Sequence, residues 1–192
     1  MPHIFQVHIE DTDRPYTGRE LSPHWIYRTY GIEGNALAVF QGPARVGVES
    51  LVDVKDAVSE RPISSDRMLH FIAEWFDVGL DIAVLRQRLF IVAIKEALES
   101  AIGDLYLDRS GDDLYDGTNK LTVSIATASP VSTLMHTGIN ILTTGTPIPT
   151  AGLDDYELDP LQIAREIIER YQNELEDIER ARCTVSPVGG GF

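Results

Sequence analysis

The residues best suited to chemistry lie between Gly111 and Leu121, where acidic side chains and turn residues are followed by a lysine. We expect a hairpin here, because Gly117-Thr118-Asn119 is a typical turn sequence. The hairpin would bring Asp112 and Asp113 to the same end as Lys120, so that carboxylates and an ammonium flank one small site. A fixed lysine neutralises charge on a phosphate, and carboxylate oxygens hold Mg²⁺. The alternative is a solvated polar turn, since turns favour aspartate.

A second group of candidate residues interrupts an apolar segment at His136, Gly138 and Asn140. A glycine within a strand allows a ligand or another backbone to approach closely. A buried imidazole or amide without a partner costs on the order of 1–3 kcal/mol. We therefore expect His136 and Asn140 either to bond to the backbone or to bind the polar end of a ligand in a pocket.

Four further polar residues stand among aromatic side chains, namely His24, Arg28, His70 and Glu74. A metal site that combines His24, His70 and Glu74 with His136 is an open alternative, but no HExxH or CxxC spacing supports it, and no metal site is predicted. The nucleotide-binding motifs GxxxxGK[ST] and GxGxxG and the serine motif GxSxG are absent as well.

Hydrophobic periodicity indicates the elements that position these residues. Apolar residues recur at helical spacing over 81–102 and over 160–180, which predicts two long helices. Gly103 is expected to end the first of them. A short helix is expected over 24–28, with Ser22 as its N-cap. The expected strands cover 3–9, 36–40, 46–54, 68–76, 105–108, 113–116, 120–126 and 133–142, and a surface loop is expected over 55–66.

Two of these assignments affect the candidate residues. Gly42-Pro43 is expected to form a turn between two strands. As a strand, the segment 68–76 places His70 and Glu74 on one face with Ile72, whereas a helix would place them one turn apart. Short strands combined with two long helices predict an α+β domain, with a mixed, mainly antiparallel sheet backed by both helices.

Composition limits the class of protein. The 192 residues suit one domain, expected over 1–182, with a flexible tail over 183–192. The net charge of −14 disfavours nucleic acid as a partner, because no basic cluster offsets it. No apolar stretch reaches the roughly 20 residues that cross a bilayer, so no membrane span is expected. The single cysteine and the absence of a signal-like N-terminus favour a cytoplasmic protein.

Three segments, in order, resemble motifs of the catalytic module of biotin and lipoate protein ligases. These are Ser110-Gly111-Asp112-Asp113-Leu114, Asn119-Lys120-Leu121-Thr122-Val123-Ser124-Ile125 and Gly138-Ile139-Asn140-Ile141. They stand where the ligases carry K-W-P-N-D-[IL], R-K-[LI]-x-G-[IL] and G-I-N-[VI], and the resemblance covers about residues 68–142. The segment from His136 to Asn140 is also similar to the H-G-x-x-x-N strand of octanoyltransferases, which share this fold.

The whole chain resembles an uncharacterised prokaryotic family, domain of unknown function 366. The residues that carry this likeness are His24-Trp25-Ile26-Tyr27-Arg28, Gly111-Asp112-Asp113-Leu114 and Ser129-Pro130-Val131-Ser132. That family is placed with the ligases by structure and has no agreed activity, so the resemblance implies a fold without a function.

The chain also departs from the ligases. Residues 28–47 lack the basic loop G-R-G-R-x-G that wraps the acyl-adenylate, and Thr122 replaces the small residue that follows the lysine. Octanoyltransferases need a cysteine that residues 143–182 do not contain, and Cys183 comes too late. These differences disfavour both adenylation and acyl transfer through a cysteine thioester.

The expected function is a small-molecule enzyme, or a degenerate one, that binds an acyl, carboxylate or nucleotide-linked ligand. Lys120, Asp113 and His136 are the expected catalytic residues. The expected ligand-binding residues are Asp112, Asn140, Gly138, Arg28 and His24. The resemblance implies ATP and Mg²⁺ as cofactors. The alternative is a non-catalytic binding or assembly module on the ligase fold, and in either case a homo-oligomer is expected.

Overall fold

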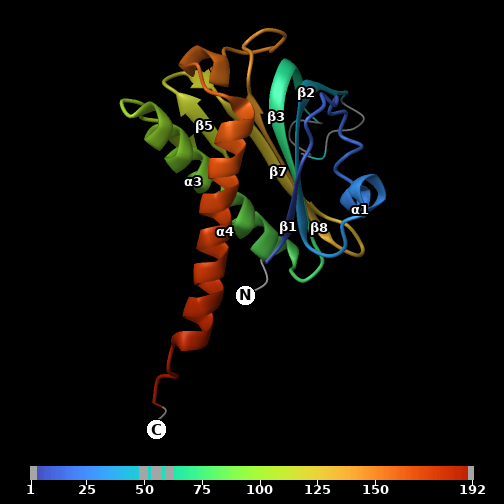
Figure 1. Cartoon of the computed structure of the whole chain (residues 1–192), viewed down its shortest axis with the longest axis vertical. Coiled ribbons are helices and arrows are strands. Elements are labelled where there is room, and N and C mark those ends of the chain that lie inside the picture. Colours follow the sequence, from blue (N-terminus) through green and yellow to red (C-terminus); the bar gives the residue numbers. More distant parts are fainter. Residues whose placement is uncertain (1–3, 48–51, 53–57, 59–62, 190–192) are drawn as a thin grey trace.

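The computed structural model describes residues 4–47, 52, 58 and 63–189, and it forms a sheet with helices on both faces (Figure 1). The strands are β1 (Gln6–Ile9), β2 (Ala36–Val46), β3 (Ile63–Trp75), β4 (Asp108–Ser110), β5 (Asp113–Asp116), β6 (Asn119–Lys120), β7 (Thr122–Ala128) and β8 (Thr133–Asn140). The helices are α1 (Trp25–Tyr30), α3 (Leu80–Ile102) and α4 (Pro160–Thr184), with a 3-10 turn at Leu153–Tyr156.

The main sheet has five strands in the order β1-β2-β3-β8-β7. β1 pairs with β2 in parallel, and the other neighbours are antiparallel. Strands β4, β5 and β6 form a separate three-stranded sheet. This arrangement confirms the α+β class and the mixed, mainly antiparallel sheet backed by two long helices.

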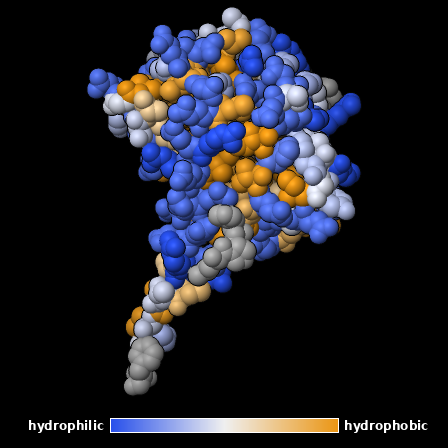
Figure 2. Space-filling model, viewed as in Figure 1, coloured by the Kyte–Doolittle hydropathy of each residue, from blue (hydrophilic) through white to orange (hydrophobic). Residues whose placement is uncertain are grey.

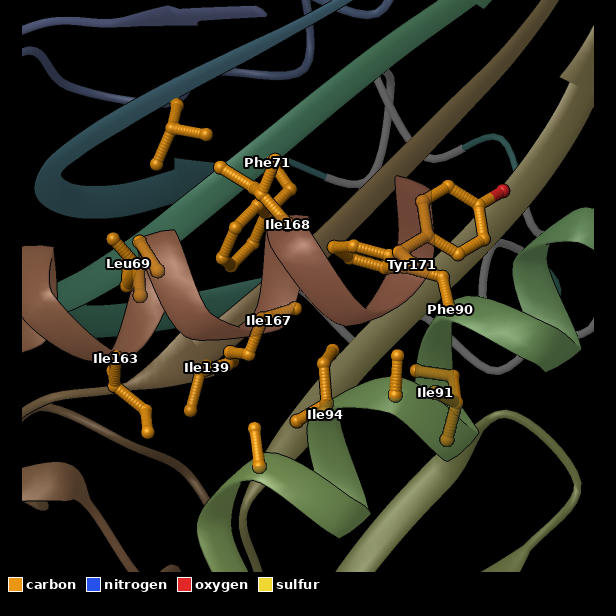
Figure 3. Close-up of a cluster of buried hydrophobic side chains, with 14 of the residues drawn as sticks. Leu69, Phe71, Phe90, Ile91, Ile94, Ile139, Ile163, Ile167, Ile168 and Tyr171 are labelled. Atoms are coloured by element: carbon orange, nitrogen blue, oxygen red, sulfur yellow. The ribbon is translucent and has the colours of Figure 1, made fainter. Parts of the chain in front are cut away.

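The helices α3 and α4 cover one face of the main sheet, and α1 lies on the other face (Figure 1). Figure 3 shows the core on the α3 and α4 side, where Phe90 of α3 lies between Phe71 of β3 and Tyr171 of α4. The Phe71 and Phe90 rings meet edge to face with their centroids 5.1 Å apart, and the Phe90 and Tyr171 rings do so at 4.9 Å. Such pairs add to the free energy gained by burying apolar surface.

Alternate residues of β3 face opposite sides of the sheet, as the period of two predicts. Leu69, Phe71 and Trp75 belong to the core beneath α3 and α4. His70 and Glu74 share the other face with Ile72, which packs with Tyr16 and Ile26 in a second cluster. The helical alternative for this segment is therefore wrong. We call the surface that bears His70, Ile72 and Glu74 the α1 face of the sheet.

Both long helices form where the sequence predicts them. Gly103 closes α3, and its N–H donates to the carbonyl of Glu99. The Asp159 side chain caps α4 by accepting from the Gln162 N–H at 2.7 Å. α4 continues to Thr184, so Cys183, which the sequence assigns to the tail, belongs to the helix. The last turns of α4 extend beyond the sheet (Figure 1) and carry mainly hydrophilic side chains (Figure 2).

Several predicted boundaries are wrong. β2 passes through Gly42-Pro43 instead of turning, because a register shift between Gly42 and Ala44 absorbs the irregularity. β3 begins at Ile63, inside the expected loop over 55–66. Most of the expected strand over 46–54 lies outside the described residues. The first strand of the small sheet is 108–110 rather than 105–108, because Gly111, with φ 66°, makes the turn one step later.

No helix in the described part of the chain is both long enough and apolar enough to span a membrane.

The irregular step in β2 depends on a glycine, and this dependence is testable. A Cβ on Gly42 would lie 2.0 Å from the carbonyl oxygen of Arg14, and its φ of +156° disfavours any side chain. We expect Gly42→Ala to lower the free energy of unfolding by about 1–3 kcal/mol, as other overpacked sites do. Chemical denaturation measures the change. Gly79→Ala, where a Cβ meets nothing within 4 Å, is the control. Equal losses in the two variants would contradict the account.

Candidate functional site

The hairpin brings Lys120 and Asp113 together, as its spacing predicts. The ammonium Nζ of Lys120 lies 2.8 Å from Oδ2 of Asp113, and the two side chains are 22% and 23% exposed. The backbone of Lys120 is held as well, because its N–H donates to Pro149 and its carbonyl accepts from Ala151, both at 3.1 Å. The lysine is therefore a fixed, half-buried cation on β6 of the small sheet, beside the end of β8.

Asp112 contacts α3 instead of Lys120. Its Oδ1 lies 2.7 Å from Nη1 of Arg88, and its Oδ2 accepts from Nε2 of Gln87 at 3.1 Å. The buried Gln87 amide also donates to Oγ of Ser124 at 2.9 Å. Asp112 thus fastens the hairpin to α3 and β7. The sequence did not single out Gln87, whose polar type inside an apolar helix stripe was the available signal.

Asn140 supports the lysine through its backbone. Its Nδ2 donates to the carbonyl oxygen of Lys120 at 3.2 Å, so its amide bonds to the main chain. Gly138 lies between His70 on β3 and Val123 on β7. A Cβ on Gly138 would lie 2.7 Å from Cε of Met68, so in this structure the glycine makes room for a side chain of the core.

His136 forms a buried pair with His70 in the middle of the α1 face. Nδ1 of His70 lies 3.1 Å from Nε2 of His136, and Nε2 of His70 lies 3.2 Å from the carbonyl oxygen of Gly42. Since a carbonyl only accepts, His70 carries its proton on Nε2, and its Nδ1 accepts from the Nε2–H of His136. Burial lowers the pKa of His70 to about 4 and lowers the pKa of His136 as well. Both imidazoles are neutral near pH 7.

Tyr16 packs against both rings of the histidine pair. Its ring stacks on His136 with the centroids 3.8 Å apart, and Tyr16 is only 3% exposed. Along β8, His136 is separated from Asn140, whose amide bonds to the backbone of Lys120. His136 stands four residues before Asn140 on β8, which corresponds to about 13 Å at roughly 3.3 Å per residue. None of the hydrogen bonds or ion pairs between described residues joins His136 to Lys120. Sequence reasoning missed Tyr16, which belongs to no motif.

Glu74 joins β3 to α1 and to the start of β8. Its Oε1 accepts from Oγ of Ser132 at 2.6 Å and from the backbone N–H of His24 at 2.8 Å, and Oε2 shares that N–H at 3.0 Å. His24 is left-handed, with φ 60° and ψ 15°, and α1 starts after it instead of after Ser22. The carboxylate holds this unusual backbone in place.

A surface hollow of about 300 Å³ opens beside Glu74. It is lined by His24, Ile26, Tyr27, Ile32, Glu33, Gly34, Glu74 and Phe76. Of the predicted ligand-binding residues, only His24 lines it. Arg28 lies on the exposed side of α1, and its Nη2 is 3.4 Å from Oγ of Ser22. In the described part of the chain, no three or more histidine, cysteine, aspartate or glutamate side chains could hold a metal ion together.

Comparisons with known proteins relate the chain to a family of unknown function. The sequence profile of the family described as "Domain of unknown function (DUF366)" matches residues 5–186. An uncharacterized protein of Methanocaldococcus jannaschii is 38% identical over 172 residues, which cover 86% of this chain and 77% of that protein. The structure of a protein of unknown function from Pyrococcus horikoshi superposes with a TM-score of 0.88 at 33% identity. That match covers 95% of this chain and 98% of the other.

More distant structures share the fold. A biotin protein ligase from Aquifex aeolicus, in complex with biotin and ATP, gives a TM-score of 0.62 at 14% identity, over 91% of this chain and 72% of the ligase. A protein from T. acidophilum with bound lipoic acid gives 0.58 at 15% identity, over 90% and 86% of the two chains. The fold is therefore that of the biotin and lipoate protein ligases, as the sequence motifs predict.

The buried histidine pair makes stability depend on pH. Unfolded histidines take up a proton below their ordinary pKa of 6.5, whereas folded His70 does so only near 4, so stability falls as the pH drops through this window. We expect the free energy of unfolding to fall by about 2 kcal/mol between pH 7 and pH 5 because of His70 alone. Denaturation at the two pH values measures the loss, which should be smaller in His70→Gln. An NMR titration in which both rings gain a proton near pH 6.5 would refute the assignment.

Proposed function

The chain belongs to the DUF366 family, and we propose that it binds a small ligand whose anionic end meets Lys120. The ligand is an acyl carboxylate or an acyl group linked to a nucleotide. One observation carries the proposal: a half-buried lysine is held 2.8 Å from Asp113 at the end of the sheet, on the fold of the biotin and lipoate protein ligases. Asp113 acts as a positioning residue, because its carboxylate holds the ammonium in a fixed place.

Electrostatics makes Lys120 a selective position for an anion. The chain carries 30 acidic and 16 basic side chains, so most of its surface repels anions. The ammonium of a lysine has three donors, and the ion pair with Asp113 uses one direction only. A carboxylate or phosphate can therefore share the ammonium with Asp113. Partial burial strengthens that contact, because water screens it less.

The arrangement fits an anionic ligand better than it fits a bound Mg²⁺ ion. Asp113 pairs with Lys120, Asp112 pairs with Arg88, and Asp116 accepts from the Tyr156 hydroxyl at 2.8 Å. The three carboxylates of the hairpin are thus engaged separately and do not converge. Where the ligand is ATP or an acyl-adenylate, Lys120 is the residue that would contact its phosphate.

A second candidate function is a binding or assembly module that keeps the ligase fold without its reaction. The observation in its favour is the filled centre of the α1 face, where Tyr16 covers His136. A second copy of the chain is the partner that we propose for this case. β7 stands at the edge of the main sheet with Val123 and Ile125 half-buried. Light scattering after size exclusion tests this, and a monomer would count against the module.

Thermal unfolding with added ligands tests the leading proposal. The ligands are biotin, lipoate, octanoate, ATP and the corresponding acyl-adenylates, each with and without Mg²⁺. At a concentration of about 100 times its Kd, a ligand stabilises by about 2.7 kcal/mol, which raises Tm by about 5–10 °C for a chain of this size. We expect at least one ligand to do so in the wild type, and Lys120→Ala to abolish the shift.

Lys95→Ala is the matched control. Lys95 is also 22% exposed and also pairs with a carboxylate, that of Glu99 on the same helix. The two variants are comparable, since each substitution removes one charge and one ion pair. The shift should survive in Lys95→Ala, because Lys95 is not part of the proposed anion site. A wild type that responds to none of the ligands, or equal losses in the two lysine variants, would refute a binding role for Lys120.

A further inference from the structure

The hollow beside α1 forms a second site, and we propose that it binds an organic ammonium ion. This α1 hollow, of about 300 Å³, is the surface lined by His24, Tyr27, Glu74 and Phe76 together with the neighbouring residues named above. Its size is at the lower end of small-molecule sites. The proposal does not depend on the anion site at Lys120.

A buried carboxylate in the wall of the hollow supplies the first part of the argument. Glu74 is only 2% exposed, and the hydrogen bonds recorded for it come from neutral donors, the Ser132 hydroxyl and the His24 N–H. None of the ion pairs between described residues includes Glu74. A buried charge is costly unless an opposite charge accompanies it. A cation in the hollow would supply that charge at Oε2, to which the described residues donate only a shared hydrogen bond.

Aromatic rings on the same wall supply the second part. The His24 and Phe76 rings stack with their centroids 5.4 Å apart and an interplanar angle of 23°. Phe76 is 40% exposed and Tyr27 is 50% exposed, so their rings are available to a ligand. Ring faces attract ammonium groups, and most strongly those that carry alkyl groups and hold water weakly. Ile26 and Ile32 add apolar surface for those alkyl groups.

Together these features select an organic ammonium over other ligands. An anion would face the carboxylates of Glu33 and Glu74 without a lysine or arginine among the lining residues. A metal ion would need convergent oxygen or nitrogen ligands, which the described residues do not offer. The ammonium of a free amine and that of a lysine side chain share this chemistry, and the experiment separates the two sources.

The hollow is far enough from Lys120 for separate tests. Glu74 pairs with Leu134 on β8, whereas Asn140, which bonds to Lys120, stands six residues further along the same strand. Six residues of strand span about 20 Å at roughly 3.3 Å per residue. Failure of one site therefore leaves the other site unaffected.

Calorimetric titration with choline and with 3,3-dimethylbutan-1-ol, its uncharged isostere, tests the proposal on the full chain. The two probes have nearly the same shape, so a difference between them reports the charge. We expect choline to bind at least tenfold more tightly. N-acetyl-lysine methylamide forms the second arm. Tighter binding of this lysine derivative than of choline assigns the hollow to a lysine side chain, and the reverse order assigns it to a free quaternary amine.

Three variants and one control locate the binding. Glu74→Gln should weaken choline at least tenfold, and Phe76→Leu at least threefold. His24→Gly removes a ring but suits the left-handed backbone at φ 60°, so it should weaken choline without lowering stability. Glu96→Gln makes the same charge change at an exposed residue of α3 outside the hollow and should leave binding unchanged.

Three outcomes would overturn the proposal. The first is that neither choline nor the lysine derivative binds. The second is equal binding of choline and its uncharged isostere, which would show that the hollow selects shape alone. The third is an equal effect of Glu74→Gln and Glu96→Gln. This result would show that choline is attracted by the net charge of −14 and not by a contact with Glu74.

Discussion

β3 lies in the middle of the main sheet, between β2 and β8, and both of its faces are covered. On one face, α3 and α4 pack against its apolar residues. On the other face it presents His70 and Glu74, which are 0% and 2% exposed and must find polar partners inside the protein. Their partners are His136, the carbonyl of Gly42, the N–H of His24 and the hydroxyl of Ser132. This requirement links β2, α1 and β8 to one strand.

The same requirement separates the possible sites. The histidine pair and Tyr16 are buried in the centre of the α1 face. The cation Lys120 is bonded through its backbone to Asn140 at one end of β8, and the carboxylate Glu74 pairs with the other end of β8 beside exposed aromatic rings. Opposite charges therefore lie near opposite ends of β8. The fold is shared with the biotin and lipoate protein ligases, but the chemistry of its exposed positions belongs to this chain.

The sequence predicts those parts of the structure that depend on local spacing. The helices α3 and α4 and the alternation in β3 follow from periodicity, and the contact of Asp113 with Lys120 follows from a hairpin. Contacts between distant segments were not predictable. No local sequence pattern predicts that Tyr16 stacks on His136. Likewise, the direction of Asp112 depends on Gln87, which the sequence places 25 residues earlier. The strand through Gly42-Pro43 depends on a bulge that its neighbours impose.

The hydrogen bonds through the two histidines have a direction. The carbonyl of Gly42 accepts a hydrogen bond from Nε2–H of His70, and Nδ1 of His70 accepts one from Nε2–H of His136, so both donor hydrogens point toward β2. In this tautomer the other ring nitrogen of His136, Nδ1, carries a lone pair and can only accept a hydrogen bond. A group that meets this nitrogen must bring its own hydrogen, as a hydroxyl or an amide does, whereas a bare carboxylate would face one lone pair with another. The backbone oxygen of a glycine in β2 thus decides what a histidine on β8 can accept.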